Sequence, residues 1–594
     1  MRVNAMYKFL VGSFTLLLIF PGIMPAVSQT TSEQIRLNQA GFYLFAPKYA
    51  VTVNTSEEKF FVTSTDLKDT VYRGILSEER QSLNSSLKTR IADFSVLQSP
   101  GTYIVVVPGV GNSYPFQIVN NIHHVVGIAS LKGYYYQRVS MPLEEKYAGK
   151  WNRPAGHADK EVLIHPSAAS VKRPAGSKIS SPGGWYDAGD YNKYVVNSGI
   201  TMGTLLSAYE DFSSYLDSLN TNIPESSNAI PDILDEILYN LRWMFTMQDP
   251  DDGGVYNKCT NASFDGMVMP GVTTAPRYVV QKGTAATLDF AAVMAQSSRI
   301  FTKFKKQLPG LADSCSKAAQ VAWQWCQKNP AMVYDQNAIN KQYEPKITTG
   351  GYGDRDFKDE WFWAAVELSA LTKNKQFQTV ISERINDSMQ LPSWGNVRML
   401  GFYSFIRHYK RMPKEYSTEL QRVKDNLIKM ADLYLQGAGQ NAFQTVMGQT
   451  KRDFVWGSNA NAANQGIVLI NAYLLTKNKK YLDNALSNLD YILGRNATGF
   501  CFVTGIGSKP TMHPHHRPSI ADGITEPVPG LLAGGPNPGR QDKCKYEFTE
   551  PETSYTDLDC SYASNEIAIN WNAPLVYLAN AIEALQYNAG YSKK

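Results

Sequence analysis

The chain has 594 residues, of which 43% are hydrophobic and 19% charged, so it is globular and too long for one ordinary core. Its formal net charge of +5 comes without any run of Lys or Arg, which excludes an electrostatic surface for nucleic acid. Aromatic residues make up 12%, including 34 Tyr and 10 Trp. Rings beyond the needs of a core favour a flat, hydroxylated ligand such as a sugar, although tyrosine-rich cores also exist.

The first 28 residues have the pattern of a secretory signal peptide. Arg2 and Lys8 precede an apolar stretch at 9–20, and Ala26-Val27-Ser28 offers a small-residue cleavage site. No Cys follows closely, and no later apolar run is long enough to span a membrane, so we expect an exported protein, periplasmic or secreted, without a membrane anchor. Some of the six Cys could pair in an oxidising compartment, but their spacing leaves the pairing open.

Residues 33–120 are predicted to form a small β-sandwich. Short alternating runs at 49–53, 60–64, 92–97, 103–107 and 114–119 are separated by Gly, Pro, Asn and Ser. This region contains no Cys, so no disulfide can stabilise it.

Residues 123–590 show helical periodicity in about twelve segments and no convincing strand. The clearest segments are 201–219, 230–247, 284–301, 359–371, 418–434, 464–475, 480–493 and 566–587. Helical hairpins in one continuous region suggest a closed barrel of helices with its long loops at one end.

The stretch Ser180–Val196 places Asp187 and Asp190 among glycines and aromatic rings. Glycines break any regular period and let the backbone approach a partner closely. An isolated D-x-x-D is more often a turn whose carboxylates bind nearby amides, so this stretch alone does not define a site.

Two further stretches contain unusual polar residues. Met512–Arg517 holds His513, His515 and His516 beside Arg517, which fits donors aimed at hydroxyls or at a carboxylate better than a metal site, since no acidic or Cys ligand adjoins it. In 555–573, Glu566 is predicted to open an apolar helix, with Asp557 in the loop before it. Capping of the helix is the plain alternative.

Together these stretches resemble glycoside hydrolase family 9, a cellulase family with an (α/α)₆ barrel. Residues 183–194 are similar to its catalytic-base motif, 514–517 to its histidine signature and 555–573 to its acidic signature. Residues 35–41 are similar to the start of the immunoglobulin-like module that precedes the barrel in one branch. The resemblance covers essentially the whole mature chain.

The resemblance implies an inverting hydrolase, in which one carboxyl protonates the leaving oxygen and another activates water. It implies Asp190 as general base, Asp187 as a second anchor of the water, and Glu566 as general acid with a pKa raised by its apolar helix. Asp557 is expected to steady the site, and His515 and Arg517 to bind sugar hydroxyls. Candidate stacking platforms are Trp185, Tyr186, Trp456 and Tyr562.

No cofactor is expected to be required. Members with this module often carry zinc on a Cys-His pair, but Gly156-His157 stands at the corresponding place, so zinc is not expected. Asp249, Asp251 and Asp252 form an acidic turn that is a candidate for structural calcium, although a solvated turn fits its spacing better. We expect a monomer.

The predicted activity is endo-cleavage of β-1,4-linked glucan such as amorphous cellulose, mixed-linkage glucan or xyloglucan, because no cellulose-binding module is expected after the barrel. Exo action, like that of a β-glucosidase or a cellobiohydrolase, is the first alternative, since the long connection 157–182 could close the cleft on one side. A non-catalytic glucan-binding protein and an adhesion protein are alternatives of another class.

Overall fold

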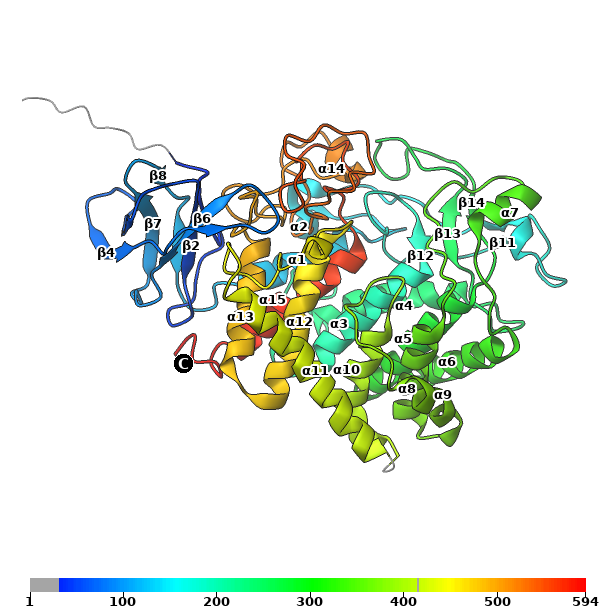
Figure 1. Cartoon of the computed structure of the whole chain (residues 1–594). Helices are drawn as coiled ribbons and strands as arrows, with labels where there is room; N and C mark the ends of the chain where they lie inside the picture. Colours follow the sequence, from blue (N-terminus) through cyan, green and yellow to red (C-terminus); the bar gives the residue numbers. More distant parts are fainter. Residues whose placement is uncertain (1–30, 414–415, 594) are drawn as a thin grey trace, which may run out of the picture.

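The computed structural model describes residues 31–413 and 416–593, and the predicted signal peptide lies outside them. Two parts follow one another along the chain, a β-sandwich and a large helical barrel (Figure 1). The predicted fold, a mainly helical (α/α)₆ barrel preceded by an immunoglobulin-like β-sandwich, is confirmed.

The sandwich has two antiparallel sheets, with strand orders β1-β2-β6-β5 and β4-β3-β7-β8, and β9 also pairs with β7. Inward-facing side chains such as Phe60, Val105 and Phe116 fill its core. The strands are β1 (Ile35–Leu37), β2 (Tyr49–Val53), β3 (Lys59–Ser64), β4 (Thr70–Ile75), β5 (Arg80–Gln81), β6 (Lys88–Asp93), β7 (Gly101–Val107), β8 (Gly111–Asn112) and β9 (Phe116–Ile118).

One predicted strand of the sandwich is displaced, and four strands were missed: β1, β4, β5 and β8. The run 92–97 is mostly a turn that follows β6, because the Asp93 carboxylate accepts hydrogen bonds from both the amide and the hydroxyl of Ser95. Strand β4 lies at a sheet edge with Val71 and Ile75 exposed, so it lacks the alternation that identifies half-buried strands.

The barrel alternates outer and inner helices along the chain. Inner helices are buried nearly all round, and α3 packs on α5, α5 on α8, α8 on α10, α12 on α15 and α15 back on α3. The inner helices are α3 (Val195–Leu216), α5 (Thr284–Phe301), α8 (Lys358–Thr372), α10 (Arg398–His408), α12 (Ser458–Thr476) and α15 (Ile569–Leu585). The outer helices are α1 (His124–Tyr136), α4 (Asp232–Met247), α6 (Leu311–Lys328), α9 (Gln378–Arg384), α11 (Ser417–Ala438) and α13 (Lys479–Ile492).

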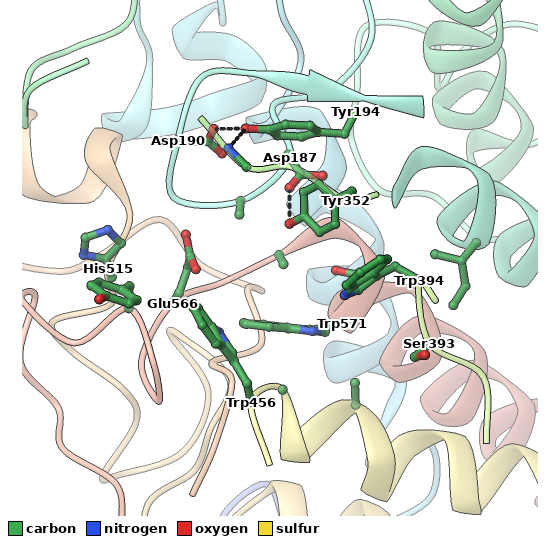
Figure 2. A pocket seen from close by; sticks show the side chains of 18 of the residues that line it. Asp187, Asp190, Tyr194, Tyr352, Ser393, Trp394, Trp456, His515, Glu566 and Trp571 are labelled. Atoms are coloured by element: carbon green, nitrogen blue, oxygen red, sulfur yellow. Dashed lines mark hydrogen bonds between the residues drawn. The ribbon is translucent and has the colours of Figure 1, made fainter. Parts of the chain in front are cut away.

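Long connections gather at one end of the barrel, where they line the pocket drawn in Figure 2. Short helices α2 (Glu145–Ala148), α7 (Gln336–Gln342) and α14 (Arg517–Ala521) lie within them. They also hold a five-stranded sheet of order β11-β10-β14-β13-β12 that the sequence did not predict, because its strands are two to four residues long and pair across distant segments. These strands are β10 (Val162–Ile164), β11 (Lys178–Ile179), β12 (Lys193–Tyr194), β13 (Lys258–Asn261) and β14 (Arg277–Val279).

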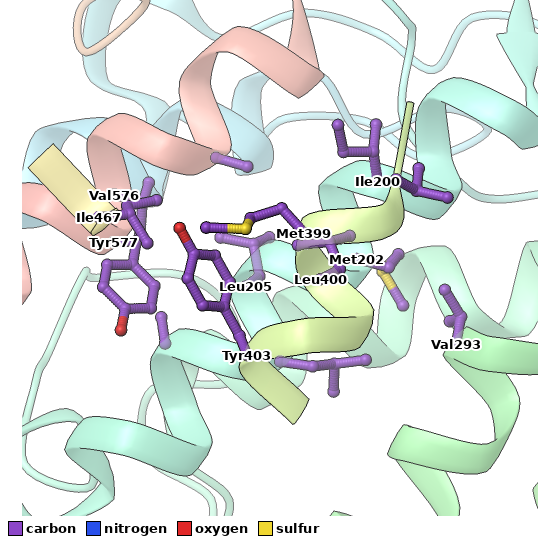
Figure 3. Packing of buried hydrophobic residues seen from close by; sticks show 14 of the residues in the cluster. Ile200, Met202, Leu205, Val293, Met399, Leu400, Tyr403, Ile467, Val576 and Tyr577 are labelled. Atoms are coloured by element: carbon purple, nitrogen blue, oxygen red, sulfur yellow. The ribbon is translucent and has the colours of Figure 1, made fainter. Parts of the chain in front are cut away.

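The centre of the barrel is a packed apolar core and not a channel. Met399 and Leu400 of α10 belong to one buried cluster with Met202 of α3, Val293 of α5 and Val576 of α15 (Figure 3). Because this core is continuous, the inner helices hold the loops at the pocket end on a rigid base.

The sandwich is fixed to the barrel by side chains near its first strand. Gln39 donates to the Gly499 carbonyl and accepts from the amides of Ser508 and Lys509. The Tyr43 hydroxyl donates to the buried Glu583 carboxylate of α15 at 2.6 Å. The Gln39 contacts join the sandwich to the segment that leads to the histidine stretch, and the Tyr43 contact joins it to α15.

Candidate active site

A cavity of about 760 Å³ opens among the loops at this end of the barrel. Asp187 and Asp190 lie on one wall, and Glu566 points into the cavity from the facing side (Figure 2). The structure therefore brings the three predicted carboxyl groups into one site. The other charged and aromatic residues of the wall are Tyr194, Phe264, Tyr352, Trp394, Trp456, His515, Arg517, Tyr562 and Trp571.

The turn that carries the aspartates depends on Gly189. A Cβ at this position would lie 2.1 Å from the His515 carbonyl oxygen, so any side chain would push the aspartate turn away from the histidine stretch. The glycine between the two aspartates thus allows two backbone segments to approach closely, which is one of the uses of glycine that the sequence suggested.

Asp190 is buried, and both of its protein hydrogen bonds go to Oδ2. Asn192 Nδ2 donates at 2.5 Å and the Tyr194 hydroxyl at 3.0 Å. No donor from the described residues bonds Oδ1. This arrangement holds the carboxylate in one orientation and leaves one oxygen for a ligand in the cavity.

Asp187 is held just as firmly. Asn197 of α3 donates to Oδ1 at 2.7 Å, and the Tyr352 hydroxyl donates to Oδ2 at 2.9 Å. Burial and the negative charge of Asp190 raise the pKa of Asp187 well above its usual range. The Asp187 carbonyl also accepts from the Ile569 amide at 2.9 Å, which ties the aspartate turn to the start of α15.

Glu566 does not open a helix as predicted. Glu566 and Ile567 form isolated β-bridges with His515 and Ala533, so the backbone is extended there and α15 begins only at Ile569. Burial and then the charges of Asp190 and Asp187 raise the pKa of the Glu566 carboxyl well above its usual range. The predicted direction of the shift holds, but its cause is the facing carboxyls and burial, not an apolar helix.

The histidine stretch supplies one side of the cavity. His515 Nδ1 pairs with the Asp559 carbonyl oxygen at 2.6 Å, and burial lowers the pKa of the His515 imidazole. His516 instead points into the protein, where its ring pairs with Gln137 and Ser519. Arg517 lines the cavity while donating to the backbone carbonyls of Gly189 and Asp265.

Asp557 does not line the cavity. Its carboxylate accepts from the backbone amides of Met512 and His513, and from the side chain of Asn565. It therefore joins the histidine stretch to the segment that carries Glu566. This placement fits a residue that steadies the site and does not place it at the reacting atoms.

The four predicted stacking residues divide into two pairs. Trp456 and Tyr562 are 43% and 37% exposed and line the cavity, with ring centroids 5.6 Å apart. Trp185 and Tyr186 are 0% and 1% exposed and do not line it, so their prediction as platforms was wrong. Trp185 packs on Tyr134 in the barrel core.

Besides Tyr194 and Phe264, three aromatic residues of the cavity were missed by sequence reasoning. Tyr352 lies in a loop of three glycines, Trp394 in a Pro-Ser-Trp-Gly loop, and Trp571 inside the acidic signature. A bulky ring in a glycine- or proline-rich loop was the signal that could have identified the first two.

The acidic turn at 249–252 does not offer a free set of metal ligands. Lys282 Nζ lies 2.7 Å from Asp249 and 2.8 Å from Asp252, and Lys172 bonds Asp251 at 3.0 Å. These contacts argue against calcium there, and Asp249 is buried rather than solvated. Across residues 31–413 and 416–593, no group of three or more His, Cys, Asp or Glu side chains is arranged to hold a metal ion.

The pairing of the cysteines, which the sequence left open, involves one disulfide. Cys544 and Cys560 are bonded, and the other four Cys are buried thiols. The disulfide closes a loop next to Tyr562, whose hydroxyl donates to the Gln541 carbonyl at 2.9 Å. It thus braces the cavity wall that Tyr562 forms.

Two family models match this chain. The model described as "Glycosyl hydrolase family 9" matches residues 126–579, and the one described as "Cellulase N-terminal ig-like domain" matches residues 30–112. Within the described residues, none of the helices combines the length and the apolar character that crossing a membrane requires.

Characterised relatives and a solved structure agree with the family models. The chain is 46% identical over 571 residues to a xyloglucan-specific endo-β-1,4-glucanase of Bacteroides ovatus, covering 96% of each chain. It is 34% identical to Endoglucanase D of Acetivibrio thermocellus, over 92% of this chain and 82% of that one. The structure of a family 9 enzyme of Bacteroides ovatus superposes with a TM-score of 0.89 at 45% identity, covering 94% of this chain and all of that one. The chain belongs to glycoside hydrolase family 9.

Proposed function

We propose that this protein is an inverting endo-β-1,4-glucanase whose preferred substrate is xyloglucan. The observation that carries the proposal is the facing arrangement of Asp187 and Asp190 on one wall of the cavity and Glu566 on the other. The similarity to a xyloglucan-specific relative over nearly the full length supports the choice of substrate.

In the proposed reaction Glu566 is the general acid. Burial and the charges of Asp190 and Asp187 raise its pKa, which favours the protonated carboxyl that can give its proton to the oxygen of the leaving glucosyl unit. The bond between that oxygen and the anomeric carbon breaks as the proton arrives, and the Glu566 carboxylate remains.

Asp190 is the general base on the opposite face of the sugar. Its free Oδ1 takes one proton from a water molecule while the water oxygen attacks the anomeric carbon. Asp187 binds the same water and fixes its direction. Inversion follows because water enters from the side opposite the leaving group.

The remaining wall residues bind the chain of the glucan. Trp456 and Tyr562 offer exposed ring faces for sugar C–H groups, and Arg517 and His515 offer donors to hydroxyls. All the groups of the proposed reaction are carboxyls and water, so we propose that it requires no metal and that a chelator leaves kcat unchanged.

The measurement that tests the proposal is the product pattern on xyloglucan, mixed-linkage glucan and carboxymethylcellulose, together with viscosity. Endo cleavage drops the viscosity early and yields mixed oligosaccharides, with the highest kcat/KM on xyloglucan. Glucose or cellobiose as the only early product would favour exo action, and no new reducing ends would favour a glucan-binding protein.

One observation weighs against the exo alternative. The connection 157–182, which could have closed the cleft, contributes no residue to the cavity wall. Its strands β10 and β11 pair with each other, and β10 also pairs with β14. The proposal further includes export through the predicted signal peptide and a monomeric state, which light scattering of the purified protein measures.

A further inference from the structure

Lys258 is a fully buried lysine behind the wall that carries Asp190. It lies on β13 opposite Tyr194 of β12 and is 0% exposed. No carboxylate of the described residues lies within 4.0 Å of its ammonium group. Burial lowers the pKa of Lys258 to about 7, and the charge of Asp190 opposes that shift. A buried charge without an ion-pair partner costs free energy, so its retention calls for a reason in its hydrogen bonds.

The ammonium group of Lys258 uses its three donors on one neighbouring region. Nζ lies 2.7 Å from Gln336 Oε1, 3.0 Å from Thr349 Oγ1 and 2.6 Å from the Gly350 carbonyl oxygen. Two of these acceptors belong to the turn 349–352, which enters the cavity. In that turn Tyr352 adopts a φ of 45°, a conformation that a tyrosine holds only when its surroundings fix it.

The turn 349–352 contacts both aspartates through tyrosine hydroxyl groups. The Gly350 amide donates to the Tyr194 hydroxyl at 3.1 Å, and that hydroxyl donates to Asp190. The Tyr352 hydroxyl donates to Asp187. Figure 2 shows both tyrosines on the aspartate side of the cavity. Hydrogen bonds, together with the backbone of residues 350–352, therefore connect Lys258 to the carboxylates of Asp190 and Asp187.

We propose that Lys258 is a positioning residue that fixes the turn 349–352 and, through Tyr194 and Tyr352, the orientation of Asp190 and Asp187. The inference rests on the proposed function, in which these aspartates orient the attacking water. A water displaced by a fraction of an ångström from its line of attack lowers the rate while sugar binding at the aromatic platform continues.

Lys258→Met removes the ammonium group and keeps an unbranched side chain. We expect kcat to fall roughly 10- to 100-fold with KM changed by less than about threefold, because positioning is lost and the platform is intact. Lys48→Met is the matched control. Lys48 is also fully buried, also caps three acceptors (the carbonyls of Tyr43, Leu44 and Ala46), and burial lowers its pKa to about 8. That variant should lose thermal stability and keep its kcat.

A double variant tests the route of the effect. If Lys258 acts partly through Tyr352, the kcat losses of Lys258→Met and Tyr352→Phe combine to less than their product. Full multiplication of the two losses, or a Lys258→Met enzyme with more than half of the original kcat, would overturn the proposal. If the Met variant does not fold, the same measurements are made on Lys258→Gln. This variant keeps amide donors, so a smaller loss of kcat is expected.

Amide hydrogen exchange gives a readout that does not depend on catalysis. Residues 348–354 should exchange faster in Lys258→Met than in the unaltered protein, and at an unchanged rate in Lys48→Met. Unchanged exchange in Lys258→Met would also overturn the proposal. If the unaltered protein cleaves no glucan, the proposed function fails, while the exchange result still decides whether Lys258 holds the turn.

Discussion

His515 and Glu566 are partners in a parallel β-bridge, and the His515 amide donates to the Asn565 carbonyl at 2.9 Å. The bridge sets the two residues on adjacent extended segments, so the imidazole enters the cavity beside the carboxyl. The same segment carries the His515 carbonyl that Gly189 approaches. Backbone contacts therefore position the proposed acid Glu566, the turn with the proposed base Asp190, and His515 relative to one another.

Glu566→Gln and Asp190→Asn should each lower kcat on xyloglucan by about 10²- to 10⁴-fold or more, because each removes one proton-transfer step without changing shape. Circular dichroism checks that both variants fold. Glu583→Gln is the control, since Glu583 is a buried carboxyl bonded to Tyr43, away from the cavity. Substantial activity in either site variant would show that the acid and base are misassigned.

The first sugar released from a β-linked substrate should be the α-anomer. Water held by Asp190 attacks the face opposite the leaving oxygen, and that attack inverts the configuration. Proton NMR in the first minutes of reaction, before the anomers equilibrate, measures it. An initial β-anomer would make one aspartate a nucleophile.

Trp456→Ala and Trp185→Ala should impair different properties, substrate binding in the first variant and folding stability in the second. Trp456 is an exposed platform, so its loss should raise KM about 2- to 10-fold, the equivalent of about 0.5–1.5 kcal/mol of stacking. Trp185 is core, so its loss should lower the free energy of unfolding by about 3–5 kcal/mol. Steady-state kinetics and urea titration of both variants separate the two roles.

Activity should fall on the alkaline side as Glu566 loses its proton. Its folded-state pKa is raised, so the protonated acid persists to a higher pH than in a free glutamate and is lost as the pH rises through the raised pKa. An aryl glucoside whose leaving group needs no proton bypasses the acid. On that substrate the unaltered enzyme should show no alkaline limb, and Glu566→Gln should retain most of its kcat. An unchanged limb would assign it to another group.

With a chelator present, the part of the stability that depends on Asp289 and Glu360 should fall as the pH rises above about 4. Burial and neighbouring carboxylates raise the pKa values of Asp289 and Glu360 well above the unfolded values near 4. The folded chain then binds more protons than the unfolded chain at neutral pH, so the free energy of unfolding decreases with pH. Melting temperatures at pH 5 and pH 8 measure the fall, which Glu360→Gln should reduce. The exposed control Glu79→Gln should leave it unchanged.

The sequence predicted those residues of the site that lie in short local motifs. Asp187 and Asp190 share a glycine-broken turn, and Glu566 stands in a stretch similar to the family's acidic signature, so the resemblance to the family selected them and the structure places them in one cavity. Helices such as α5 and α13 were also predicted closely, because their apolar period is sustained over several turns.

Other parts depend on contacts between distant segments, which a linear pattern does not carry. Trp185 and Asp187 are two residues apart, yet the turn buries the first and presents the second to the cavity. Tyr352 reaches Asp187 only because the barrel brings their loops together. Glu566 was predicted to lie in a helix because the residues that follow it are apolar and favour one. In the structure a β-bridge to His515 keeps its backbone extended.

The hydrogen bond between the Ile569 amide and the Asp187 carbonyl joins the turn before the first inner helix of the ring to the start of the last inner helix. On the proposed assignment, the groups that handle water are translated early and the group that supplies the proton is translated near the end. A nascent or truncated chain that ends before Glu566 lacks the proposed acid and also lacks α15, to which the aspartate turn is bonded. On this assignment, unfinished chains of the protein are expected to cleave no glucan.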